Sequence, residues 1–245
     1  MDSLLQWLEV PLDSWLACAA VLLLGAFVQR ATGFGLAVVG APLLLMIEPR
    51  LVPVILVLFG FTVSLMMVRR YWHEVRLREI GVALIGRLPG NGLGIWLLLA
   101  APMVVLEKLI AAIVLFAVLV TVCRFELPVN RFTLFVAGIL SGVFGTVAAI
   151  GGPPIVLLMH GFSPDRMRGN LAAFFVLTSL LTLLTLTLAL AGRISVWHFK
   201  LALTFLPAVL LGNALADTIA HRLDKQLLQR LSLGLCTLAA LGLLL

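Results

Sequence analysis

The stretch QRATGFGLAVVGAPLLLM, residues Gln29 to Met46, puts an arginine and the motif TGFG into the middle of an otherwise apolar sequence. The apolar segment around it, Ser14 to Ile47, has 34 residues, and one continuous helix of that length would measure about 51 Å. The hydrocarbon core of a bilayer is only about 30 Å thick. We therefore expect a break at Thr32-Gly33-Phe34-Gly35, because glycine disfavours helix and admits unusual backbone angles.

The composition is typical of an integral membrane protein. Of the 245 residues, 62% are hydrophobic and 11% are charged, against about 25% charged residues in soluble domains, and the mean hydropathy is +1.19. Apolar runs near the length that crosses a bilayer recur almost end to end. We expect an all-α membrane protein with about eight full transmembrane helices, or broken and re-entrant equivalents, and with up to about ten helical elements.

The net charge of +6 does not indicate nucleic acid. The basic residues form short clusters between apolar runs, as in RRYWHEVRLRE (Arg69 to Glu79), and such clusters are topology signals. Cys18, Cys123 and Cys236 lie singly, so neither a disulfide framework nor a zinc site is predicted, and no cofactor or metal is expected. The acidic start of the chain lacks a basic region, which argues against a cleaved signal peptide.

Two parts of the chain resemble each other at an offset of about 115 to 118 residues. TGFG (32–35) falls against AAIG (148–151), FGFTVSL (59–65) against FFVLTSL (174–180), and LPGNGLG (88–94) against LPAVLLG (206–212). We predict a first transmembrane repeat at 1–123, a second at 132–245, and a cytoplasmic linker at 124–131. The second repeat carries its own helix breaker, Gly151-Gly152-Pro153-Pro154. Broken segments at equivalent places in two repeats point to a transporter site.

The basic residues favour an inverted arrangement of the repeats. With each broken segment counted as a down-and-up pair and the N-terminus outside, eleven of the 17 basic residues lie inside, four outside, and Arg30 and Arg87 at membrane depth. If each broken segment is instead one crossing, eight basic residues lie inside and seven lie outside. The positive-inside rule prefers the first arrangement, which makes the loop from Arg69 to Glu79 cytoplasmic and both termini external.

Three motifs carry a family resemblance: QRATGFGLAVVGAPLLL (29–45), GTVAAIGGPPIVLLM (145–159) and RGNLAAFFVLTSL (168–180). They resemble the paired signatures of the sulfite exporter TauE/SafE family, and the resemblance covers almost the whole chain. It implies a multi-pass protein of the bacterial inner membrane that exports sulfite or small organosulfonates from the cytoplasm. Leu36-Ala37 follows Gly35 where many members carry a further glycine, which changes the detailed shape expected of the loop.

A backbone broken at membrane depth needs protein or a polar cavity to receive its free amide and carbonyl groups. Half-helices beginning after Gly35 and after Pro154 would offer amides to an anion; the alternative is that the glycines only allow tight helix packing. Arg30 and Arg87 either face this cavity or snorkel to the surface. The expected substrate-binding residues are Thr32, Gly33, Gly35, Arg87, Asn91, Gly151, Gly152, Asn170 and Asn213.

Asp217, Arg30 and His160 are candidates for coupling transport to an ion. Asp217 lies well along an apolar run, where it is either a proton relay or the partner of Arg222. His160 is either a group that titrates near neutral pH or an ordinary interfacial histidine. The expected partners are a small anion, the bilayer, and a proton or cation as coupling ion, with a homodimer left open. The rival functions are a passive anion channel, an assembly protein, and a hydrolase using Ser141 with His160, which lacks a nucleophile motif and a paired acid.

Overall fold

The computed structural model describes residues 10–32, 35–123, 127–159, 161–189, 196–219 and 225–244, and these residues form α-helices joined by short connections. In chain order the helices are α2 (Leu12–Thr32), α3 (Leu36–Ile47), α4 (Val54–Arg70), α5 (Leu77–Ala100), α6 (Met103–Cys123), α7 (Arg131–Ala148), α8 (Pro153–Val156), α9 (Pro164–Ala189), α10 (Val196–Ile219) and α11 (Lys225–Gly242). Two short 3₁₀ turns, η1 (Pro49–Leu51) and η2 (Trp72–Glu74), flank α4.

Six helices, α2, α5, α6, α7, α9 and α10, are long and apolar enough to cross a bilayer. α4 has 17 residues, and the apolar parts of α3 and α11 are shorter still. The prediction of an all-α membrane protein is therefore confirmed, and ten α-helices are present in the described chain. The finer prediction of about eight full spans is not confirmed.

Both expected helix breaks are present. α2 ends at Thr32 and α3 begins at Leu36, after Gly35, whose φ is 142°. α7 ends at Ala148, and the break begins earlier than the glycine pair, because Ala149 takes the left-handed conformation with φ 60°. α8 then has only four residues, so the second half offers loop amides rather than the half-helix expected after Pro154.

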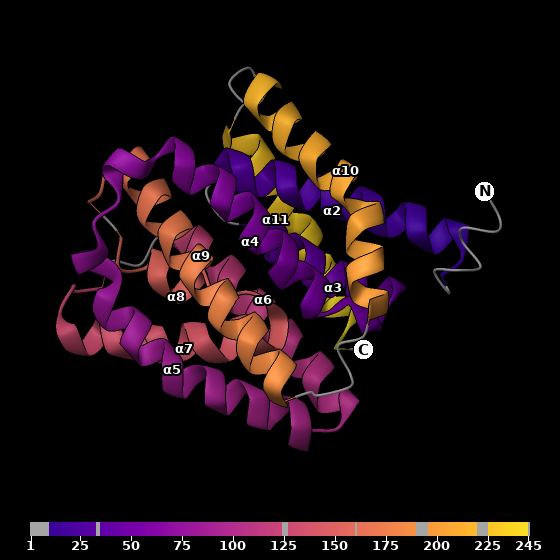
Figure 1. The fold of residues 1–245 in the computed structure, drawn as a ribbon, viewed down its shortest axis with the longest axis horizontal. Helices are drawn as coiled ribbons and strands as arrows, with labels where there is room; N and C mark the ends of the chain where they lie inside the picture. The colour runs from indigo at the N-terminus through magenta and orange to yellow at the C-terminus, as the bar shows by residue number, and fades with distance from the viewer. Residues whose placement is uncertain are drawn as a thin grey trace.

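The helices pack in pairs that join the two halves of the chain. In Figure 1, α5 and α7 lie side by side along one edge, α2 and α10 lie together on the opposite side, and α4 and α9 run between them. The helix pair α5–α7 is in contact at the backbone, because a Cβ added at Gly86 or Gly90 would meet the carbonyl oxygens of Phe135 and Ile139. Small residues permit such close approach in membrane proteins.

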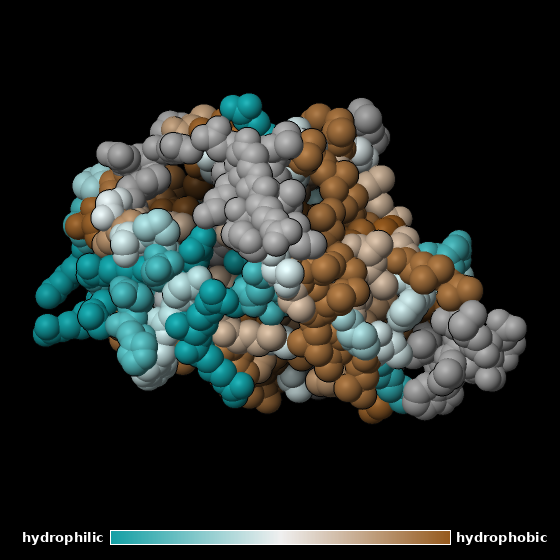
Figure 2. Space-filling view, turned by 90° about the horizontal axis from the view of Figure 1, so that it is seen from above, coloured by the Kyte–Doolittle hydropathy of each residue, from teal (hydrophilic) through white to brown (hydrophobic). Residues whose placement is uncertain are grey.

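The surface separates into hydrophilic and apolar regions. Figure 2 shows hydrophilic side chains gathered at the end of the molecule that holds the α4–α5 connection, and hydrophobic side chains across much of the rest. Arg69, Arg70, Arg76 and Arg78 are exposed around this connection. An apolar surface beside a basic end is typical of a protein that spans a bilayer.

Candidate functional site

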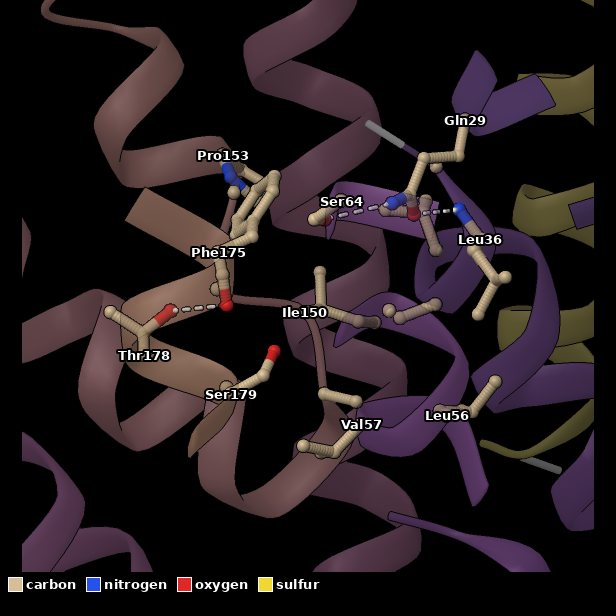
Figure 3. A pocket seen from close by; sticks show the side chains of 18 of the residues that line it. Gln29, Leu36, Leu56, Val57, Ser64, Ile150, Pro153, Phe175, Thr178 and Ser179 are labelled. Atoms are coloured by element: carbon tan, nitrogen blue, oxygen red, sulfur yellow. Dashed lines mark hydrogen bonds between the residues drawn. The ribbon is translucent and has the colours of Figure 1, made fainter. Parts of the chain in front are cut away.

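A cavity lies where the two helix breaks meet. It has a volume of about 50 Å³ and is lined by α2, the start of α3, α4, α5, the end of α7, the second break and α9 (Figure 3). Its lining includes Gly35 from the first break and Gly151 and Gly152 from the second. By the same measure one water needs roughly 10–15 Å³, so the space suits a compact ion with a few waters.

Gln29 organises the first break. Its Oε1 accepts from the amide of Leu36 at 3.3 Å, and its Nε2 donates to Oγ of Ser64 at 3.3 Å (Figure 3). The first turn of any helix has amides without a partner inside the helix, and Gln29 satisfies the one at Leu36. The next two amides of that turn belong to Ala37 and Val38, which both line the cavity, so these two are the amides that the first break can offer to a ligand.

Arg87 is the charge at this cavity. It is 3% exposed, lies on α5, and lines the cavity. Nη1 donates to the carbonyl oxygen of Ser141 at 2.9 Å and to its Oγ at 2.7 Å, and Nη2 donates to Oγ1 of Thr182 at 3.2 Å. Three hydroxyl and carbonyl contacts from α7 and α9 therefore hold the guanidinium in place.

Ser141 joins the guanidinium to the second break. Its hydroxyl accepts from Arg87 and donates to the carbonyl oxygen of Gly151 at 2.6 Å. A Cβ at Gly151 would lie 2.5 Å from Nη1 of Arg87, and one at Gly145 would collide with Nη2. A larger residue at either position would therefore require the guanidinium to shift. Gly145 and Gly151 thus lie against the guanidinium, whereas Gly86 and Gly90 lie against the backbone of α7 and serve helix packing.

The charge of Arg87 has no carboxylate partner in the described part of the chain, and the Nε of this side chain is buried without a hydrogen-bond partner. Burying an unpaired charge is expensive, and buried ions are normally paired or bound to a ligand. Neutral hydroxyls and carbonyls position the guanidinium without neutralising it. The cavity therefore carries an uncompensated positive charge, which is suited to an anion.

The predicted asparagines are placed differently. Asn91 lies one turn after Arg87 on α5, and its Nδ2 donates to the same Thr182 hydroxyl at 3.2 Å, so it adjoins the site without lining the cavity. Asn213 is buried on α10 and is not among the described lining residues. Asn170 lies in a different cluster, where its Oδ1 accepts from the amide of Arg76 at 2.7 Å and its Nδ2 donates to Glu79 at 2.6 Å.

Two of the three candidate coupling residues, Asp217 and Arg30, form an ion-pair cluster with Arg70. Asp217 accepts from Nε and Nη2 of Arg30 at 2.8 and 2.9 Å and from Nη1 of Arg70 at 3.0 Å. This cluster joins α2, α4 and α10, and Arg30 follows Gln29 of the cavity wall directly in the chain. The described residues do not include His160, Gly33, Phe34 or Arg222, the alternative partner of Asp217. The side chain of Thr32 also lies outside the described part of the chain.

Several site residues were not predicted from the sequence. Gln29, Ser64, Thr178 and Ser179 line the cavity, and Ser141 supports Arg87. Figure 3 shows the Ser179 hydroxyl directed toward the middle of the cavity, and no hydrogen bond joins it to the described residues. The repeat offers a signal for two of them, because FGFTVSL and FFVLTSL place Ser64 and Ser179 at equivalent positions.

A protein-family model described as Sulfite exporter TauE/SafE matches the chain over residues 17–243. The match covers both breaks, Arg87 and every other residue that lines the cavity. The chain belongs to this family. No curated protein and no solved structure matches it.

Membership of TauE/SafE, a family of membrane transporters, agrees with the six apolar helices and makes this chain a multi-pass membrane protein. Within the described residues of this TauE/SafE protein, no group of three metal-binding side chains occurs. The hydroxyl of Ser141, considered as a nucleophile, donates to the carbonyl of Gly151. In this arrangement Ser141 supports the cavity wall.

Proposed function

We propose that this protein exports small sulfur-containing anions, sulfite or an organosulfonate, from the cytoplasm without altering them chemically. The observation that carries the proposal is the buried Arg87 guanidinium, which faces the cavity with no carboxylate partner in the described chain. An anion in the cavity balances this charge. A sulfur oxyanion fits because its oxygens accept several hydrogen bonds within a small volume.

Three kinds of donor surround the proposed anion. Arg87 supplies charge, Gly151 and Gly152 supply amides from the second break, and the Ser179 hydroxyl supplies a neutral donor. Glycine lets a ligand approach the backbone closely. Space for the remainder of an organosulfonate lies over Gly60, which lines the cavity and where an added Cβ would meet no atom within 4 Å.

The cavity is formed by equivalent positions of two inverted repeats. In the alignment of the halves, Gly35 corresponds to Gly151 and Ser64 to Ser179, and all four residues line the cavity. The alignment of the halves pairs α2 with α7, α4 with α9 and α5 with α10. Exchanging the halves therefore turns the contact between α5 and α7 into the contact between α10 and α2, and leaves the contact between α4 and α9 unchanged. This symmetry of the helix packing supports the proposal. Inverted repeats with broken helices place substrate sites near the bilayer midplane.

Asp217 is the proposed coupling residue. Protonation of its carboxylate would release Arg30 and Arg70 together, and Arg30 is adjacent in sequence to Gln29 at the cavity. A proton arriving at Asp217 would in this way loosen the contact between α2, α4 and α10 beside the first break. Such an ion-pair rearrangement is a known form of switching element in proteins.

The proposal is tested by flux of labelled sulfite in liposomes that contain the purified protein. Arg87→Gln should lower flux strongly while thermal unfolding shows a folded protein, and Arg87→Lys should retain part of the flux because it keeps the charge. Arg69→Gln, at an exposed position outside the cavity, is the matched control. Unchanged flux in Arg87→Gln would reject the site.

Two other functions are distinguished by the same preparation. A passive channel would conduct sulfite down its gradient but would fail to accumulate it against one when a proton gradient is imposed. An assembly protein would show no flux of any anion tested, even though the protein is folded.

A further inference from the structure

A second cavity lies behind α8. It has a volume of about 230 Å³ and is lined by the start of α5, the start of α7, α8 and the connection to α9. Its interior is apolar and is formed mainly by Ile80, Ala83, Leu134, Ile155, Leu158 and Met159. By the measure at which one water needs roughly 10–15 Å³, this space holds roughly fifteen water-sized groups, several times the capacity of the cavity beside Arg87.

The rim of this cavity carries a free positive charge. Arg78 lines it, is exposed, and makes no ion pair with any residue that the structure describes. Glu79, also at the rim, already receives Arg166 and Asn170, and Arg166 lies over the ring of Phe162 at 4.8 Å. The charge of Glu79 is thus balanced, whereas that of Arg78 is not.

We propose that this cavity binds an anionic phospholipid, with one acyl chain in the apolar interior and the phosphate at Arg78. Arg78 lies in the first turn of α5, one of the helices able to cross the bilayer, so it lies at headgroup level whichever side faces the cytoplasm. Basic residues at this level attract anionic lipids, and burial of acyl methylene groups is favourable. A free phosphate would leave the interior empty, and a zwitterionic phospholipid would bring its own cationic headgroup beside Arg78, so it would balance that charge less well than an anionic phospholipid.

The lipid would lie against the back of the second break. Pro153 lines the cavity beside Arg87, whereas Ile155 and Leu158, on the same short segment, line the second cavity. α8 therefore separates the two spaces. A bound acyl chain packs against α8 and supports the loop that presents Gly151 and Gly152, so removal of the lipid should also weaken anion transport.

Native mass spectrometry of the purified full-length protein tests the binding step without any assumption about transport. With equal amounts of phosphatidylglycerol and phosphatidylcholine added, we expect one phosphatidylglycerol to be retained in preference. Arg78→Gln should reduce its retention about fivefold, the effect of roughly one basic residue near a membrane surface, whereas Arg69→Gln should not. Equal retention of both lipids, or equal effects of the two substitutions, would overturn the proposal.

Filling the interior supplies an independent variant. Leu134→Trp should block lipid retention, whereas Leu134→Met, which conserves volume, should leave it unchanged. Thermal unfolding checks that both variants fold; if the tryptophan variant does not, the comparison of Arg78 with Arg69 decides. Displacement of the lipid by inorganic phosphate alone would show that Arg78 holds a free anion and would also overturn the proposal.

Discussion

A methyl group at Gly151 would lie 2.5 Å from Nη1 of Arg87 and 3.0 Å from Oγ of Ser141, so we expect Gly151→Ala to displace the guanidinium. Nη1 makes two hydrogen bonds to Ser141, and hydrogen bonds to charged groups contribute about 1.5–3 kcal/mol each. The loss of one such bond from the anion site corresponds to about a tenfold to 150-fold loss of affinity.

The assay is the concentration dependence of labelled sulfite flux in liposomes, from which KM is obtained. Gly92→Ala is the matched control, because Gly92 lies on the same helix as Arg87 and an added Cβ meets no atom within 4 Å. The control should keep its KM. A KM for Gly151→Ala within twofold of the native value would refute the reasoning, and loss of flux together with loss of folding would indicate that Gly151 serves packing instead.

Ser179→Ala should raise the KM for sulfite about fivefold without changing thermal stability, because the hydroxyl donates to no described residue; an unchanged KM would remove it from the site. Gly60→Val narrows the cavity without touching Arg87, so flux of a larger organosulfonate should fall before that of sulfite, and an equal effect on both would contradict this. Asp217→Asn should abolish accumulation driven by a proton gradient while downhill flux persists; accumulation at the native level would exclude Asp217 from coupling. A cysteine at Glu74, on a cysteine-free background, should react only with reagents applied from the cytoplasm, and labelling from outside would reverse the topology.

Local features of the sequence were enough to predict the membrane class and the helix breaks. A largely apolar segment of 34 residues is too long for one crossing, so the break at Thr32 to Gly35 follows from length and glycine alone. The second break was predicted from Gly151-Gly152-Pro153-Pro154, but it begins at Ala149, whose left-handed conformation has no sequence signature. Backbone conformation at such a residue is imposed by its surroundings.

Only the tertiary structure decided which polar side chains share a site. Arg30 and Arg87 were both expected at membrane depth, yet Asp217, 187 residues away, pairs with Arg30. Among the described residues, Arg87 instead donates to neutral groups of Ser141 and Thr182 and lies 5.7 Å from the ring of Phe174. Asn170, part of the family motif, is held by Glu79 across 91 residues. Local composition predicts where a helix crosses or breaks, because those choices depend on neighbours in sequence. Whether a buried charge is paired or free depends on residues that only the packed helices bring together.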